Sequence, residues 1–219
     1  MSSSTDSTSR ATRLRSRAIE LLPLLRVEDQ SKFLKKFRSE SAQQAAHSTG
    51  ELFVGVFLLK NGFRPHHEVE VQGQTPDWVL FREDNSIEAL VDQFTFHQGA
   101  EIEGEQTLAM QTMTAWVGWV PDNTPRLYQK LLAKAEHYST TAESVSAPLI
   151  VAVFSHFFAA VDRDELQEVL FRAYGGGIFE VCKQLSGVIL SQESCGQYAF
   201  EYIPNPQALR PIHLVGCTV

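Results

Sequence analysis

Three acidic residues have the order and surroundings of a metal site. Glu51 follows a glycine near the start of an apolar helical stretch, Asp77 follows a proline at the head of the run WVL, and Asp92 lies inside the run LVDQF. Carboxylates are rarely buried unless something pairs with them or binds them. A divalent cation between two buried carboxylates removes their mutual repulsion, and oxygen ligands suit Mg²⁺ or Mn²⁺. The three residues therefore predict a site for one of these ions.

A predicted hairpin brings the two aspartates together. Residues 78–81 and 87–96 have the apolar composition of strands, and the polar residues 82–86 form a short loop between them. Because the loop is short, the two strands should be adjacent and antiparallel. Asp77 then opens one strand and Asp92 lies in the middle of the next.

The elements before this hairpin also follow from the sequence. A helix is predicted from residue 41 to an Asn-Gly stop at 61–62, and Glu51 is expected near the start of the helix, where the helix dipole favours a carboxylate. Alternation of Val69 and Val71 with acidic residues predicts a strand over 63–71, followed by a turn at 72–74.

The rest of the chain predicts an α/β protein. Helices, a meander of three strands and then alternating helices and strands indicate a mixed sheet with helices on its faces. The further helices are predicted at 11–25, 27–37, 127–138 and 163–173, and the further strands at 149–154, 185–190 and 198–203. Residues 98–126 are interpreted as a broken helical excursion, in which Trp116 and Trp119 pack in the core or form a subunit contact. The GGG at 175–177 is predicted to be a flexible linker. The predicted division is a disordered tail at 1–9, a helical N-terminal extension at 10–45 and an α/β domain at 46–219.

Composition and charge restrict the class of protein. The 219 residues carry a net charge of −7, and residues 1–40 hold nine basic against five acidic residues, or +4, which leaves −11 for the remainder. The basic arm either contacts nucleic-acid phosphates or forms a solvated helix surface. Three widely spaced cysteines exclude a disulfide framework. No apolar run reaches about 20 residues and no signal peptide is recognisable, which predicts a cytoplasmic protein without a membrane partner.

The order of these motifs resembles the PD-(D/E)XK nuclease-like superfamily. The resemblance rests on Glu51 in TGELFVGVFLLKNGF, on Pro76-Asp77 in TPDWVL and on Asp92 in ALVDQF. Downstream, Lys134-Ala-Glu-His-Tyr138 is similar to a Gln/Lys-xxx-Tyr helix motif of part of that superfamily, and APLIVAVF, LSGVIL and IPNPQALRPI are similar to the closing strands and tail of its bacterial members. The resemblance covers about residues 47–212.

This resemblance implies a three-layer α/β/α fold of restriction-endonuclease type. It also implies hydrolysis of DNA or RNA phosphodiesters with Mg²⁺, in which Glu51, Asp77 and Asp92 hold the metal. DNA is the expected partner, and a homo-oligomer is left open. In the superfamily a lysine two residues after the second acid orients the attacking water, but here that position holds Phe94.

Three explanations for the missing lysine remain open. Gln93 could substitute, although alternation along a strand points it away from Asp92. Lys134 could supply the charge from the following helix, which gives a predicted catalytic set of Asp77, Asp92 and Lys134. Alternatively, the chain is a non-catalytic interaction protein that keeps the nuclease fold.

The same acids also have structural interpretations. Asp77 could be a plain turn residue, and Asp92 could form a buried salt bridge with Lys134 or an arginine. Glu88 would be the functional acid if the strand register were different. A zinc site is disfavoured because the adjacent His66 and His67 should point to opposite faces of a strand.

Overall fold

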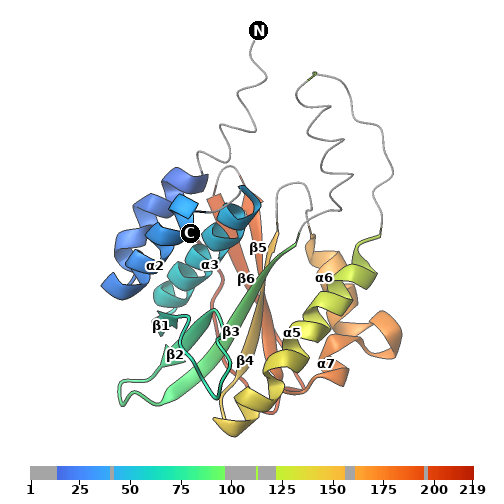
Figure 1. The fold of residues 1–219 in the computed structure, drawn as a ribbon. Coiled ribbons are helices and arrows are strands. Elements are labelled where there is room, and N and C mark those ends of the chain that lie inside the picture. Colours follow the sequence, from blue (N-terminus) through green and yellow to red (C-terminus); the bar gives the residue numbers. More distant parts are fainter. Residues whose placement is uncertain (1–13, 40–41, 97–111, 113–121, 156–160, 195–196) are drawn as a thin grey trace.

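A mixed β-sheet forms the centre of the molecule (Figure 1). The structure is a computed structural model that describes residues 14–39, 42–96, 112, 122–155, 161–194 and 197–219. Within these residues seven strands form one sheet whose spatial order is the same as their order in the chain. The strands are β1 (Arg64–His67), β2 (Trp78–Phe81), β3 (Ile87–Phe96), β4 (Leu149–Ser155), β5 (Leu185–Ser194), β6 (Gln197–Pro204) and β7 (Cys217–Thr218).

The type of strand pairing changes twice across the sheet. The first three strands form an antiparallel meander, β3, β4 and β5 run parallel, and β6 and β7 are again antiparallel to their neighbours. Parallel neighbours need long crossover connections, and helices occupy both of them. The helices are η1 (Leu22–Leu24), α2 (Val27–Ser39), α3 (Ala42–Lys60), α5 (Thr124–Ser144), α6 (Arg163–Phe171), η2 (Ala173–Gly175) and α7 (Gly177–Val181).

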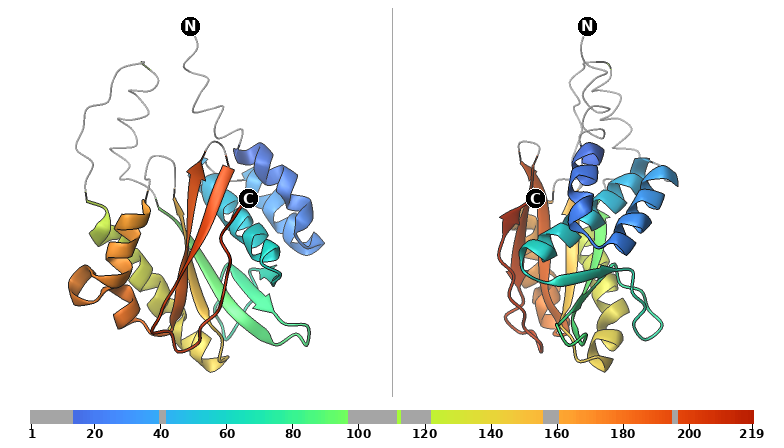
Figure 2. Two further views of the ribbon diagram at one scale, coloured as in Figure 1. Left: turned by 180° about the vertical axis from the view of Figure 1, so that it is seen from behind. Right: turned by 90° about the vertical axis from the view of Figure 1, so that its left-hand side faces the viewer.

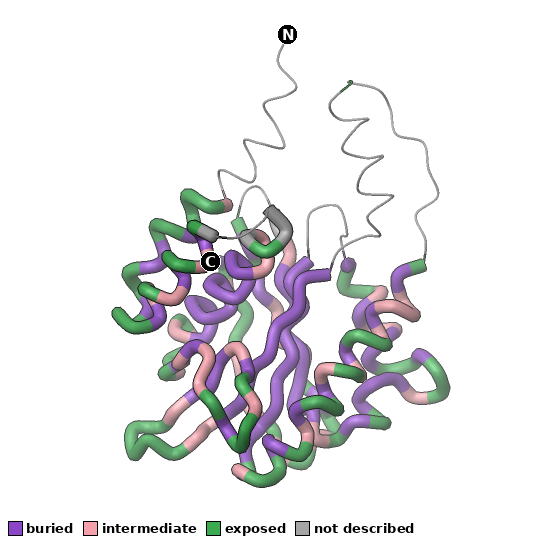
Figure 3. Tube along the Cα trace, in the orientation of Figure 1, coloured by how far each residue is buried: buried purple, intermediate pink, exposed green. Residues whose placement is uncertain are grey.

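Helices cover both faces of the sheet (Figures 1 and 2). Helices α2 and α3 pack on one face, and α5, α6 and α7 pack on the other. Alternate side chains of each strand enter the two layers, as Trp78 and Val79 do in β2. The central strands are therefore buried along most of their length (Figure 3). This arrangement confirms the predicted α/β class with a mixed sheet.

The N-terminal helices share the core of one face. The ring of Phe33 in α2 lies 5.9 Å from that of Trp78 and 4.3 Å from that of His67, measured between centroids. Leu22 and Leu25 belong to the same apolar cluster. The predicted boundary at residue 46 falls inside α3.

Most predicted elements form, and β2 and β3 have the predicted bounds. The predicted strand over 63–71 is wrong in its second half, because β1 ends at His67. Glu68 has a φ of 49°, which breaks the extended backbone. Val71 then pairs with Gln74 in a tight turn of its own instead of extending β1.

The predicted flexible linker at 175–177 is also wrong. The three glycines form a compact turn between α6 and α7, in which Gly175 and Gly177 have φ values of 93° and 74°. A Cβ at Gly177 would lie 2.3 Å from the carbonyl oxygen of Leu170, so close packing and positive φ both require glycine there.

Two further predictions concern parts of the chain that are only partly described. Trp116 and Trp119 lie outside the described residues, as does most of the predicted excursion over 98–126. Helix α5 begins at Thr124 and is longer at both ends than predicted. In the described ranges no helix combines the length and the apolar composition needed to span a membrane.

Candidate functional site

Asp77 lies at the point where β2 begins and is held from three directions. The peptide N–H of Gln93 donates to Asp77 Oδ2 at 2.6 Å, and the N–H of Glu68 donates to the carbonyl oxygen of Asp77 at 3.0 Å. The hydroxyl of Tyr138 on α5 donates to the carbonyl oxygen of Thr75 at 3.1 Å. The β2–β3 pairing begins at Trp78, so the backbone N–H of Gln93 has no β2 carbonyl beside it. The Asp77 carboxylate accepts its hydrogen bond instead.

Asp92 lies next to Asp77 on the neighbouring strand. Trp78 pairs with Val91 in the β2–β3 register, so the position opposite Asp77 is that of Asp92. Asp92 is 1% exposed and faces the α5 side of the sheet, as Leu90 and Phe94 do. Glu88 lies four residues earlier, at the start of β3, so the register favours Asp92 as the acid beside Asp77.

Lys134 from α5 reaches this buried acid. Its Nζ lies 2.6 Å from Asp92 Oδ2, and its side chain keeps 36% of its exposure. A charge brought from the helix therefore pairs with Asp92, which is the geometry that the explanation based on Lys134 requires. The same ion pair also satisfies the structural interpretation of Asp92 as half of a salt bridge.

Gln93 does not occupy the position of the missing lysine. Its Nε2 donates to Thr95 Oγ1 at 3.0 Å, and both side chains are buried. Gln93 packs beside Gly50 of α3, on the face of the sheet opposite Asp92. The prediction that strand alternation points Gln93 away from Asp92 is confirmed.

Electrostatics at Asp77 disfavour its ionised form. Burial raises the pKa of this carboxyl well above its usual range, and the nearby charges of Asp92 and Glu51 raise it further. The Gln93 hydrogen bond and the Lys134 charge lower the pKa only in part. The site therefore lacks the positive charge that would keep Asp77 ionised beside Asp92.

Glu51 occupies a different environment on the α3 side of the sheet, and it lies in the middle of α3, not near the start of the helix as predicted. Its carbonyl oxygen accepts a hydrogen bond from the indole N–H of Trp78 at 2.9 Å. Its carboxylate lies 2.8 Å from Lys36 Nζ, 3.0 Å from His47 Nε2 and 3.1 Å from His67 Nε2. All three predicted acids thus lie near the start of β2, but the oxygens of Glu51 are bound by basic side chains.

The ionised form of Glu51 is stabilised by these partners. Burial raises the pKa of this carboxyl, but the hydrogen bonds from His47 and His67 and the charge of Lys36 outweigh burial and hold the pKa far below its usual range. Glu51 is therefore a carboxylate at neutral pH.

Asp77 and Asp92 fit a divalent cation in their chemistry. Both offer carboxylate oxygens, and a cation between them would remove the repulsion that raises the pKa of Asp77. Among the residues that the structure describes, no group of three or more His, Cys, Asp and Glu side chains has the arrangement of a metal site. The two aspartates are thus brought together, and Glu51 does not complete a three-ligand set with them.

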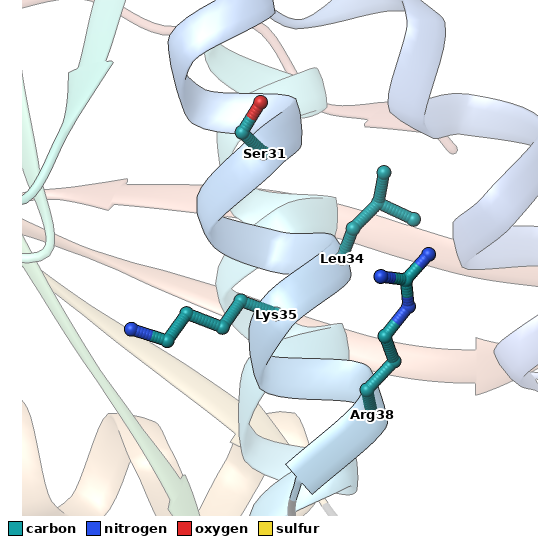
Figure 4. Close-up of a pocket in the computed structure, with 4 residues that line it drawn as sticks. All are labelled: Ser31, Leu34, Lys35 and Arg38. Carbon is teal, nitrogen blue, oxygen red and sulfur yellow. The ribbon is translucent and has the colours of Figure 1, made fainter.

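A separate hollow lies on the outer side of α2 and includes none of the predicted site residues. Ser31, Leu34, Lys35 and Arg38 line it (Figure 4).

The chain was compared with known proteins. No relative was found. No protein-family model matches the sequence, no curated protein matches it, and no solved structure matches its fold. The interpretation of the site therefore rests on its own geometry.

Sequence reasoning missed the basic partners of Glu51. Lys36 comes from α2 and His67 from the end of β1, and neither is near Glu51 in the sequence. His66 and His67 do point to opposite sides, as predicted, because His67 is buried and His66 is partly exposed. The only local signal was His47, four residues before Glu51 on the same helix face.

Replacing Glu51 with glutamine should lower the free energy of unfolding by about 3 kcal/mol, because removal of one partner leaves other buried charges uncompensated. Urea denaturation at pH 7 measures this loss. Since the pKa of Glu51 is lowered in the folded state, its stabilisation is present above the ordinary glutamate pKa of about 4.3 and is lost as the pH falls below it. The difference between wild type and E51Q should therefore shrink in acid.

Glu68→Gln is the matched control for this prediction. Glu68 also pairs with Lys36, at 2.8 Å, but its side chain is 37% exposed. We expect a loss below about 1 kcal/mol, as is usual for exposed ion pairs. Equal losses in the two variants would contradict a special role for the buried carboxylate.

Proposed function

We propose that the chain is a divalent-metal-dependent phosphodiesterase of the PD-(D/E)XK type that acts on DNA. The observation that supports this proposal most directly is the grouping of Asp77, Asp92 and Lys134. Two aspartates lie side by side on antiparallel strands, and a lysine ammonium lies 2.6 Å from the second of them. This is the set of two acids and one lysine that the chemistry requires, with the lysine supplied by α5 instead of β3.

The order of the elements also supports the proposal. Helix α3 precedes the antiparallel β1–β2–β3 meander, α5 follows, and β4 returns parallel to β3. The resemblance in the sequence implies this arrangement for a restriction-endonuclease-like core. Helices lie on both faces of the sheet, as a three-layer α/β/α fold requires (Figure 2).

Asp77 and Asp92 would hold Mg²⁺ or Mn²⁺. When bound, such an ion polarises the phosphoryl group and lowers the pKa of a water molecule. The negative charge of Glu51 acts on Asp77, while the oxygens of Glu51 remain with Lys36, His47 and His67.

The remaining residues position groups and carry charge. The Gln93 N–H fixes one oxygen of Asp77, and the Tyr138 hydroxyl fixes the loop that presents it. The Lys134 ammonium has three donors, so it can bind Asp92 and a phosphate oxygen at the same time. Its charge would stabilise the negative charge that develops on the phosphoryl oxygens.

Thermal unfolding with and without millimolar Mg²⁺ or Mn²⁺ tests the proposal. A dissociation constant ten times below the metal concentration raises the stability by about 1.4 kcal/mol, which corresponds to a rise of a few degrees in Tm. We expect this rise in wild type and in D84N, which changes an exposed aspartate of the hairpin loop. We expect no rise in D77N.

Cleavage of labelled single-stranded and duplex DNA in Mg²⁺, with an RNA of the same sequence for comparison, completes the test. Absence of both a metal-dependent rise in Tm and cleavage by wild type would rule out the phosphodiesterase and favour a non-catalytic interaction protein.

A further inference from the structure

A row of three basic residues leads away from the candidate site along α5. Arg126, Lys130 and Lys134 are spaced four residues apart, so they lie on one side of the helix, and Tyr138 follows at the same spacing. Each step of four residues advances about 6 Å along the axis. The row thus carries three positive charges over about 12 Å and ends at the tyrosine that holds the Asp77 loop.

The row follows β3 step by step. Lys134 contacts Asp92, Lys130 Nζ lies 5.7 Å from the ring centroids of both Phe94 and Phe96, and the Arg126 guanidinium lies 5.1 Å from that of Phe96. Side chains on one face of a strand repeat about every 6.6 Å, close to the 6 Å step of the helix. The helix row and the strand face therefore stay in register from Asp92 to the end of β3.

Lys130 has no acidic counterpart in this register. Asp92 pairs with Lys134, but the next two strand positions are the buried Phe94 and Phe96. In the part of the chain that the structure describes, no carboxylate forms an ion pair with Lys130, although its side chain is exposed. Like charges four residues apart on a helix destabilise it, so an anion beside Lys130 would offset the repulsion from Arg126 and Lys134.

Electrostatics agree with this geometry. Partial burial against the two phenylalanine rings lowers the pKa of Lys130, and the charges of Arg126 and Lys134 lower it further. An anion placed beside the row would relieve this repulsion between like charges.

We propose that Lys130, assisted by Arg126, binds the phosphates of the nucleic-acid strand that adjoin the phosphate at Asp77, Asp92 and Lys134. The proposal rests on the proposed function, and it names the substrate feature that the site reads: the phosphodiester backbone of one strand. A lysine binds phosphate as a point charge and an arginine as a planar fork.

The row reads the backbone and not the bases. Phe94 and Phe96 are 6% and 0% exposed, so their rings cannot stack with bases. Contacts to phosphates position a strand without recognising its sequence. Phe94 thus has a role at the position where the superfamily has lysine, because its ring supports the aliphatic chain and the ammonium of Lys130.

Fluorescence anisotropy with a labelled 15-nucleotide oligothymidylate, in EDTA so that no cleavage occurs, measures this contact. For single strands each neutralised phosphate contributes about 0.7 to the slope of log K against log salt. K130Q should therefore lower that slope by about 0.7 and, near 0.1 M KCl, weaken binding about fivefold.

Two control variants separate charge from position. K130R keeps the charge at the same position, and its affinity should stay within about twofold of wild type. K183Q removes a positive charge from an exposed lysine before β5, at the opposite end of the parallel strands from Phe96, and should bind as wild type does.

Each outcome decides between the two proposals. If wild type fails to bind the oligonucleotide in 50 mM KCl, or if K130Q and K183Q bind equally, the phosphate row is wrong, even when Mg²⁺ raises Tm and cleavage occurs. If K130Q alone weakens binding but wild type shows neither metal response nor cleavage, phosphate binding by Lys130 is supported and the proposed phosphodiesterase activity is wrong. With cleavage present, K130Q should raise KM about fivefold and leave kcat within twofold.

Discussion

Asp77→Asn should slow DNA cleavage in saturating Mg²⁺ by about 10³-fold or more, because loss of a metal ligand removes several kcal/mol of stabilisation from the transition state. The amide oxygen of asparagine can still accept the hydrogen bond from Gln93, so the loop geometry should be kept. Single-turnover cleavage of a labelled DNA duplex measures the loss.

The same substitution should raise the stability of the metal-free protein at neutral pH. The pKa of Asp77 is raised in the folded state by burial and by the charges of Asp92 and Glu51, so the ionised carboxylate opposes folding above that pKa. Asparagine removes this charge. As the pH falls toward about 3.9, the carboxyl is protonated in both states and the difference between wild type and variant should disappear.

Melting curves of wild type and D77N without metal test whether stability rises while activity falls. D77N should melt above wild type at pH 8, and the two curves should approach each other near pH 4. A D77N protein that is inactive and also less stable at pH 8 would show that Asp77 is a structural turn residue. That result would remove the main electrostatic reason for a cation at this position.

The hairpin could be predicted because its signals are local. Strands 78–81 and 87–96 are apolar runs separated by a polar loop, and the pairing register follows once the loop is short. The proximity of Asp77 and Asp92 follows from that register alone. The pairing of Lys134 with Asp92 was foreseen as one of several explanations, because a helix after β3 must cover one face of the sheet.

The environment of Glu51 could not be predicted because it depends on tertiary packing. Lys36 reaches Glu51 only because Phe33 packs α2 against Trp78 and His67. No pattern within α3 indicates these partners apart from His47. The early end of β1 was missed for a similar reason, since alternation over 68–71 is a strand signal that a positive φ at Glu68 overrides.

Consequently, the three acids predicted as equals have two different roles in the structure. The neighbouring negative charges raise the pKa of Asp77 beside Asp92, whereas the carboxylate of Glu51 is bound by Lys36 and two histidines. A cation would therefore bind more favourably at Asp77 and Asp92 than at Glu51. Glu51 fixes α2, α3 and β1 to one another around the start of β2 and adds its field to the site.

Lys134→Met should lower kcat by about 10² to 10³-fold, the usual loss when one donor to a developing negative charge is removed. Methionine keeps the length of the side chain but has no charge. Metal-dependent stabilisation should persist because Asp77 and Asp92 remain. The substitution also leaves the buried Asp92 unpaired, so without metal the free energy of unfolding should fall by about 3 kcal/mol.

A second substitution separates this structural loss from the catalytic one. In the double variant D92N/K134M the buried charge of Asp92 is removed together with its partner, so the stability should recover while cleavage stays slow. If K134M alone cleaves DNA as fast as wild type, Lys134 only neutralises Asp92 and the site needs another source of positive charge.

Moving the lysine to the strand gives the sharpest test of its role. Phe94 faces α5 on the same side of the sheet as Asp92, two residues further along β3. In F94K/K134M a lysine therefore returns to the position that the superfamily uses, and we expect at least a tenfold recovery of kcat over K134M. F94K also displaces the ring below Lys130, so KM should rise in the same variant. Recovery of kcat together with a higher KM would show that α5 supplies both the catalytic charge and the contacts that bind the DNA strand.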